Sequence, residues 1–276
     1  MLLSVLVVGA CHRFDPVAEV PHREAPDTQS AIELILAENP PPRVFAIGEY
    51  HQTRATAGAT SSMQRFTREI IGLLEPRARH LVVESWVDDA CDSRFGHQVA
   101  ATIDRPATTQ MELMRLVRTS QRAHLDTHDL PMTCIEQHAL FDPRHGVDFL
   151  LLLEVITQKL HDAARTWAEA DPAHAVIVYG GALHNDLYPR WALDELSYAE
   201  PLARELGPGS VLEIDLVVPE IVAPMRMVRD EPWFPLLGRA SPSRAIVWRR
   251  GPGSYVVILP AQSEAVARVA LPDEVM

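Results

Sequence analysis

The sequence predicts an α/β protein with a mostly parallel sheet, helices on both faces and a C-terminal antiparallel hairpin. Short, fully apolar runs alternate with segments of helical periodicity, which is the pattern of strands that crossover helices bury on both sides. Near the C-terminus, two strand-like runs flank the turn-forming residues Gly251, Pro252 and Gly253, which favours a hairpin at the edge of the sheet. The 276 residues are enough for one large core.

Each expected element follows from local pattern. Residues such as Met63, Phe66 and Ile70 recur at helical spacing before Pro76 ends the pattern. The expected helices are Ser30–Glu38, Ser61–Glu75, Met111–His124, Asp148–Ala170 and one ending over Leu202–Leu206. The expected strands are Val44–Ile47, Leu81–Val83, Leu130–Ile135, Ala175–Tyr179, Val211–Val218, Ala245–Trp248 and Tyr255–Leu259. The proline-rich segment Pro219–Ser243 fits either a lid or pocket wall, or a loop packed on the sheet.

The N-terminus divides the chain into three parts. Residues 1–11 are an uncharged apolar run that ends in Val8-Gly9-Ala10-Cys11, and they resemble the lipobox of a bacterial lipoprotein signal, although no Lys or Arg precedes the run. Residues 12–29 are polar and proline-containing, as expected of a tether, and residues 30–276 form a single α/β domain. We therefore expect a lipid anchor at Cys11 and a place in the bacterial cell envelope. The alternative is a buried first strand in a cytoplasmic protein.

Charge and cysteine content exclude several classes of protein. The formal net charge of -12 argues against binding to nucleic acid, whose affinity depends on Lys and Arg contacts to phosphate. Three cysteines do not make a disulfide scaffold. We expect Cys134 to be buried in an apolar strand and Cys91 to lie in a polar loop, so we do not expect the two to pair. Signatures of P-loop NTPases, dinucleotide-binding folds and α/β-hydrolases are absent from the sequence.

Polar side chains follow three of the predicted strands. Glu49 and His51 come just after Val44–Ile47, Glu84 follows Leu81–Val83, and His184 follows Ala175–Tyr179. Ligands bind beyond the carboxyl ends of strands in open α/β sheets, so we expect these side chains to lie close together. Each of them alone has a structural explanation, such as capping a turn or pairing with an arginine. Together they predict a site.

The order of these motifs resembles a known superfamily. Gly48-Glu49-Tyr50-His51, then Val82-Val83-Glu84-Ser85, then the YGGALH run that ends at His184 are similar to motifs of the superfamily of ChaN-like haem-binding lipoproteins, Tiki and TraB proteins and erythromycin esterases. The resemblance covers roughly Val44 to Asp186, and the lipobox is a further likeness to the ChaN branch. It implies that His51 and His184 match the motif histidines and that Glu49 and Glu84 match the acidic positions. Tiki-like members are metal-dependent peptide hydrolases, erythromycin esterase-like members activate water on an ester, and ChaN-like members bind haem.

Three functions remain open. The favoured one is a water-activating hydrolase of ester or peptide bonds, with His51, Glu49, Glu84 and His184 as catalytic groups or as ligands of a divalent metal. The alternative is a haem-binding protein of iron uptake, with Tyr50 or Tyr179 as a further candidate ligand. The third is a non-catalytic binding protein. The expected partners are a small molecule, a peptide or haem, and the membrane through the lipid anchor.

Three weaker candidates lie outside this set. Glu136-Gln137-His138 follows the expected third strand and could add a ligand, although this is not favoured. Asp215, within a strand, fits either the site or an ion pair with an arginine. His124, Asp126, His128 and Asp129 form a polar cluster for which a solvated loop is favoured over a metal site.

Overall fold

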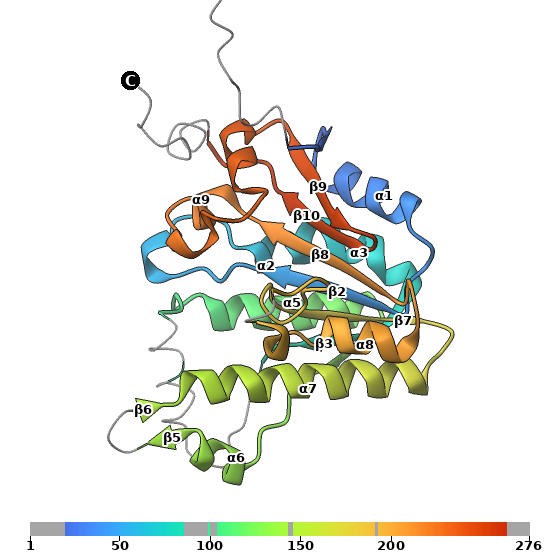
Figure 1. Ribbon diagram of the computed structural model, residues 1–276, viewed down its shortest axis with the longest axis vertical. Coiled ribbons are helices and arrows are strands. Elements are labelled where there is room, and N and C mark those ends of the chain that lie inside the picture. Colours follow the sequence, from blue (N-terminus) through green and yellow to red (C-terminus); the bar gives the residue numbers. More distant parts are fainter. Residues whose placement is uncertain (1–19, 86–98, 100–103, 143–145, 191–192, 264–276) are drawn as a thin grey trace, which may run out of the picture.

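The computed structural model describes residues 20–85, 99, 104–142, 146–190 and 193–263. This part of the chain contains an eight-stranded sheet of order β1-β9-β10-β8-β2-β7-β3-β4 (Figure 1). From β10 to β4 neighbouring strands are parallel, whereas β9 is antiparallel to both β10 and β1. The predicted fold class is confirmed. The strands are β1 (Arg23–Ala25), β2 (Val44–Glu49), β3 (Ala78–Val83), β4 (Asp126–His128), β7 (Ala175–Gly181), β8 (Val211–Val217), β9 (Ala245–Gly251) and β10 (Ser254–Ile258), with β5 (Phe141–Asp142) and β6 (Gly146–Val147) forming a separate pair.

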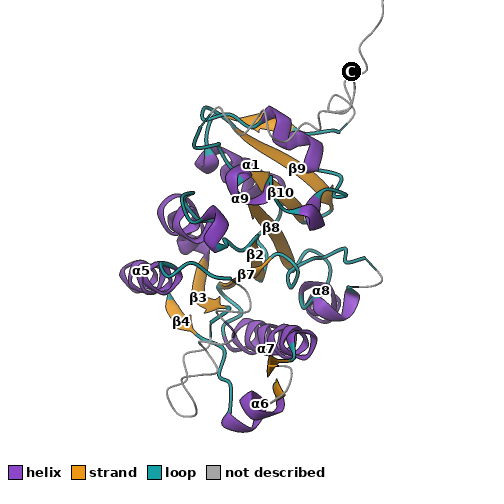
Figure 2. Cartoon of the chain, turned by 90° about the vertical axis from the view of Figure 1, so that its left-hand side faces the viewer, coloured by secondary structure: helices purple, strands orange, loops and turns teal. Residues whose placement is uncertain are grey.

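Helices cover both faces of the sheet. Figure 2 shows α5 on one side of β3 and β7, and α7 and α8 on the other. The α-helices are α1 (Thr28–Glu38), α2 (Ser62–Arg65), α3 (Ile71–Leu74), α5 (Thr109–Arg122), α6 (Cys134–Ala139), α7 (Phe149–Ala170), α8 (Ala199–Leu206) and α9 (Pro219–Val222). A π-helical turn, η2 (Phe66–Ile70), joins α2 to α3, and 3-10 turns occur at η1 (Arg54–Thr56), η3 (Glu75–Arg77), η4 (Asp194–Leu196), η5 (Arg226–Val228) and η6 (Phe234–Arg239).

Strand β2 lies at the centre of the core and is buried along its whole length. Phe45 and Ile47 pack with α1, α2, α3 and α5 on one face. Val44 and Ala46 pack with α7 and α8 on the other face. Because successive side chains of a strand point to opposite faces, a strand buried on both sides is apolar along most of its length. This is why the sequence pattern locates β2, β7 and β8 correctly.

The proline-rich segment after β8 packs against the sheet. Trp233, Leu236 and Leu237 are fully buried against residues of β8, β9 and β10. Of the two readings of Pro219–Ser243, the structure shows the packed one. The segment nevertheless reaches the candidate site, because the ring of Trp233 lies 5.6 Å from that of Tyr50.

The prediction of a third strand over Leu130–Ile135 is wrong. The strand that pairs with β3 is β4, and Cys134 begins helix α6. Thr133 caps this helix, with its side chain and that of Glu136 each bonded to the other's backbone N–H. This capping box favours a helix start, and Pro131 cannot donate to a strand ladder.

Part of the predicted tether is ordered. Arg23–Ala25 pairs with Ala245–Val247 as the outermost strand β1, and α1 begins at Thr28 behind its cap Asp27. An edge strand is hard to predict from the sequence when its outward-facing residues are polar, because only one side of such a strand packs on the core. Residues 1–11, with the proposed lipid attachment at Cys11, lie outside the described residues. In the described part, no helix is long and apolar enough to cross a bilayer.

Cys134 is disulfide-bonded. The expectation that it is a buried thiol in an apolar strand is therefore wrong, since it is half-buried and opens α6. The other two cysteines, Cys11 and Cys91, lie outside the described residues.

Trp233 provides a test of the packed segment. Because its ring is fully buried, Trp233→Ala is expected to lower the free energy of unfolding by about 3–5 kcal/mol, measured by urea denaturation. Met227 lies in the same segment and is 81% exposed, so Met227→Ala is expected to change stability by less than about 0.5 kcal/mol. Equal effects of the two substitutions would show that this segment does not close the core.

Candidate functional site

The ends of β2, β7 and β3 meet at one edge of the sheet. Glu49 is the register partner of Gly181, one residue beyond the pair formed by Gly48 and Gly180. The backbone N–H of Glu84 donates to the carbonyl of Tyr179 at 2.8 Å. The parallel register thus brings the three motifs within contact of one another, as the sequence predicts for strands that end at a common edge.

Glu49 and His51 are in direct contact, and they are the closest pair among the four candidate residues. His51 Nδ1 lies 2.8 Å from Glu49 Oε1, and the Tyr179 hydroxyl donates to Glu49 Oε2 at 2.5 Å. Arg105 Nη1 lies 3.2 Å from Glu49 Oε1. Burial alone would raise the pKa of Glu49, but the bond to His51 and the charge of Arg105 outweigh it and hold this pKa below the ordinary value. Glu49 is therefore a buried, ionised anchor for the imidazole.

His51 has two alternative tautomers in this setting. Arg105 Nη2 lies 2.6 Å from the same Nδ1 atom that faces Glu49. Arginine can only donate, so Nδ1 either donates to Glu49 or accepts from Arg105. Donation to Glu49 leaves the lone pair on Nε2. Burial and Arg105 lower the pKa of His51, but its bond with Glu49 and the nearby charge of Glu84 outweigh them and raise it above the ordinary value.

Glu84 lies on the other side of the imidazole. Its Oε2 accepts from the Gly181 N–H at 2.5 Å, and its Oε1 lies 3.8 Å from His51 Nε2. Burial would raise the pKa of Glu84, but the interaction with His51 and the hydrogen bond from the Gly181 N–H help to bring it down to about 2. A Cβ atom at Gly180 would lie 2.8 Å from Glu84 Oε2, so glycine is required at this position for the carboxylate to lean over the strand.

His184 is buried behind the site. Its Nδ1 lies 2.8 Å from Thr157 Oγ1 and 3.2 Å from the Leu196 carbonyl. Its side chain is 2% exposed, and burial lowers its pKa. Burial therefore favours the neutral form of His184, and Thr157 of α7 fixes its ring.

The two candidate tyrosines differ in position. Tyr179 is fully buried and its hydroxyl is bonded to Glu49. Tyr50 packs its ring against Trp233. The hydroxyl of Tyr179 is therefore engaged by Glu49, and haem binding stays a prediction.

The four predicted metal ligands do not form a matching donor set. Both oxygens of Glu49 are engaged, one by Tyr179 and the other by His51 and the guanidinium of Arg105. Nδ1 of His184 is engaged by Thr157. Among the described residues, no group of three or more His, Cys, Asp or Glu side chains is arranged to hold a metal ion. A metal would need a rearrangement of Glu49 and Arg105.

A second buried polar cluster adjoins the site through Gly48. Asp215 Oδ1 accepts from Asn185 Nδ2 at 3.1 Å, and a Cβ atom at Gly48 would overlap both side chains. Asp215 and Glu213 share one cation, Arg250, whose guanidinium nitrogens lie 3.6 Å and 3.1 Å from their carboxylates. Burial raises the pKa of Asp215 to about 7, and burial with the Asp215 charge raises that of Glu213 as well.

Sequence reasoning missed several of these residues. Arg105 lies in an Asp-Arg-Pro loop with no distinguishing pattern, and its relation to Glu49 depends on tertiary structure alone. The alternation of Glu213 and Asp215 with apolar neighbours in β8 was a usable signal, because side chains two apart in a strand share a face. Both interpretations of Asp215 fit the structure, because its carboxyl group lies 3.6 Å from Arg250 Nη2 and also leans over Gly48 beside the site.

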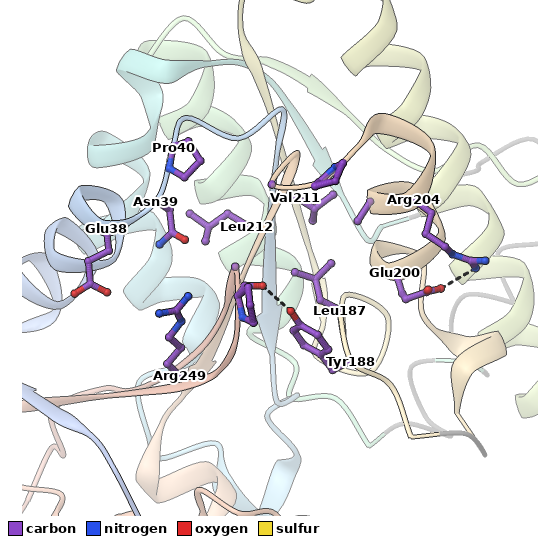
Figure 3. Close-up of a pocket in the computed structure, with 15 residues that line it drawn as sticks. Glu38, Asn39, Pro40, Leu187, Tyr188, Glu200, Arg204, Val211, Leu212 and Arg249 are labelled. Atoms are coloured by element: carbon purple, nitrogen blue, oxygen red, sulfur yellow. Dashed lines mark hydrogen bonds and ion pairs between the residues drawn. The ribbon is translucent and has the colours of Figure 1, made fainter.

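A hollow of about 740 Å³ lies at the opposite end of the sheet (Figure 3). Its lining includes Pro40, Leu187 and Arg249, and the Tyr188 hydroxyl closes one side by donating to the Pro252 carbonyl at 2.8 Å. None of the predicted site residues lines it.

Comparison with known proteins does not assign a family. No protein-family model matches the chain, and no curated protein matches it significantly. Its fold is similar to a solved type III effector, HopBA1, at 17% identity and a TM-score of 0.42, over 91% of this chain and 99% of the other. It is also similar to the signal recognition particle receptor FtsY from Elizabethkingia anophelis in complex with GDP, at 14% identity and a TM-score of 0.30, over 67% of this chain and 46% of the other. Likenesses this distant carry no functional argument.

The Asp215 cluster predicts an unusual dependence of stability on pH. An unfolded aspartate titrates near pH 4, so with a folded pKa of about 7 the folded state binds more protons between these values. Stability from this group is present at low pH and is lost as the pH rises through about 7. Asp215→Asn is expected to flatten the fall in unfolding free energy between about pH 5 and about pH 8, measured by urea denaturation, while Glu213 retains part of it.

Asp230→Asn, at an exposed aspartate, is the matched control and is expected to leave the pH profile unchanged. A wild-type slope in the Asp215→Asn protein would contradict the inference that this carboxyl takes up a proton on folding.

Proposed function

We propose that the protein is a hydrolase of ester or peptide bonds in which His51 activates water. The observation that carries the proposal is an imidazole held between two buried carboxylates at a strand-end site. His51 is 31% exposed while Glu49 and Glu84 beside it are 4% and 10% exposed. The two carboxylates therefore hold the ring in place, while its exposed part is accessible to water and substrate, as a general base requires. The function implied by the resemblance to the erythromycin esterase and Tiki branches is in agreement.

The gap between His51 and Glu84 suits the nucleophile. At 3.8 Å, Nε2 and Oε1 are too far apart for a direct hydrogen bond, and such a separation is one that a single water bridges. Both atoms are acceptors when Nδ1 donates its proton to Glu49. A water molecule bound between them donates one hydrogen bond to each atom. Its oxygen lone pair then points outward, toward a carbonyl carbon.

The proposed hydrolysis needs one water molecule and no group beyond the side chains described. His51 Nε2 takes a proton from water as the oxygen bonds to the carbonyl carbon. Glu49 stabilises the imidazolium through Nδ1, and Tyr179 and Arg105 hold Glu49 in place. The tetrahedral intermediate collapses as the bond to the leaving oxygen or nitrogen breaks, and Nε2 returns its proton to the leaving group. Since the pKa of His51 is raised, the unprotonated base form becomes populated at a higher pH than it does in an ordinary histidine.

We also propose that the protein acts in the bacterial cell envelope, held there by a lipid on Cys11. The small residues before Cys11 support this proposal, and so does the disulfide at Cys134, since disulfides persist in oxidising compartments outside the cytoplasm.

His51 is the principal test of the catalytic proposal. Loss of a general base lowers turnover by about 10²–10⁴-fold, so His51→Ala is expected to lower kcat by at least about 10²-fold on chromogenic acyl esters or on a peptide panel. Glu49→Gln keeps the shape but removes the charge that favours the imidazolium, and is expected to lower kcat with little change in KM.

The matched control is His138→Ala, at an exposed histidine of α6, which is expected to retain wild-type activity. Wild-type turnover in His51→Ala, or no hydrolysis of any ester or peptide in the panel, would exclude the proposed mechanism.

The anchor has a separate test. Expressed in a bacterium with its full N-terminus, the wild-type chain is expected in the membrane fraction, released by detergent but not by salt. Cys11→Ser lacks the thiol that accepts the lipid, and is expected to lose detergent-dependent fractionation. Membrane association that survives this substitution would contradict lipidation at Cys11.

A further inference from the structure

A second set of imidazoles lies at the far edge of the sheet, away from the candidate site. His80 of β3 and His128 of β4 face each other, with His80 Nδ1 3.1 Å from His128 Nε2. Both rings stack on the indole of Trp167 from α7, with ring centroids at 4.6 Å and 3.9 Å. Three elements therefore hold two ring nitrogens at a fixed separation.

The surroundings fix the orientation of His80. Its Nε2 points toward Asp171 Oδ2 at 3.9 Å, and His174 Nδ1 lies 2.9 Å from the same carboxylate oxygen. A carboxylate on that side favours a proton on Nε2 and leaves the Nδ1 lone pair directed at His128.

We propose that His80 and His128 form a two-imidazole site for a divalent transition metal such as Zn²⁺, Ni²⁺ or Cu²⁺, with water completing the coordination. Two nitrogens 3.1 Å apart can each lie about 2.0–2.1 Å from one ion with an angle of about 100° between them. Imidazole is a preferred ligand of these metals. His128 is half-buried at an edge strand, so an ion reaches the pair from solvent.

The site differs from the one considered from the sequence. Asp126 forms an ion pair with Arg79 at 2.9 Å, and His124 is exposed in a left-handed turn with φ 57°. His128 alone of that cluster contributes, and its partner His80 lies 48 positions earlier in the chain. A bound ion would join β4, which has only β3 as a neighbour in the described sheet, to the core.

Trp167 supplies a direct measurement. Titration of the purified full chain with NiCl₂ is expected to quench the Trp167 fluorescence and to saturate at one equivalent. His80→Asn and His128→Asn are each expected to raise the apparent Kd at least about tenfold. Trp167→Phe is expected to remove the saturable quenching. ZnCl₂ is expected to raise the Tm of the wild type, because a ligand that binds only the folded state stabilises it, and to leave both histidine variants unchanged.

Two matched controls separate this site from other histidines. His138→Asn removes an exposed histidine and His51→Ala removes the base of the candidate site, and both are expected to titrate like the wild type. Because His128 is half-buried, His128→Asn carries the test if His80→Asn fails to fold. Wild-type quenching in His128→Asn, quenching lost in His138→Asn or His51→Ala, or no saturable quenching of the wild type would each overturn the proposal.

Discussion

The candidate site depends on the register between β2 and β7. This register places Gly48 beside Gly180 and Glu49 beside Gly181 at the carboxyl edge of the sheet. Because glycine has no side chain, polar groups from neighbouring segments can occupy the space beside these positions. Asp215 and Asn185 lie over Gly48, and Glu84 lies over Gly180. At Gly181 the ring of His51 comes so close that a Cβ atom would lie 3.1 Å from Nε2. A shift of one residue in either direction would place Ile47 or Glu49, instead of Gly48, beside Gly180. A side chain would then lie where the register now places a glycine.

The sheet also separates the two carboxylates that flank His51. Glu49 follows Phe45 and Ile47 on the face covered by α1, α2, α3 and α5, where Tyr179 meets it. Glu84 leans toward the face covered by α7, from which Thr157 holds His184. His51, just beyond the end of β2, reaches both. Glu49 therefore orients the imidazole through Nδ1 from one face of the sheet, while Nε2 lies opposite the carboxylate of Glu84 from the other face.

The sequence predicts the strand ends well and the partners of the site residues poorly. Strands buried on both faces are largely apolar, so the positions of Glu49, Glu84 and His184 could be predicted from where the apolar runs end. Arg105 and Thr157 come from segments whose local pattern carries no information about what they will contact. The wrong prediction at Leu130–Ile135 has a different origin, because the capping box formed by Thr133 and Glu136 is itself a local signal that outweighs the apolar run. Local pattern fixes where a chain is buried, and tertiary register fixes which polar groups meet.

The buried cluster around Asp215 bears on how the site keeps its charge. Glu49 and Glu84 are both held ionised around one imidazole and one guanidinium. A third negative charge beside Gly48 would raise the energy of both carboxylates in a medium that screens poorly. Arg250 cannot neutralise both Glu213 and Asp215, and burial raises the pKa of each. The neutral, protonated form of Asp215 is therefore the form most compatible with the ionised Glu49 and Glu84.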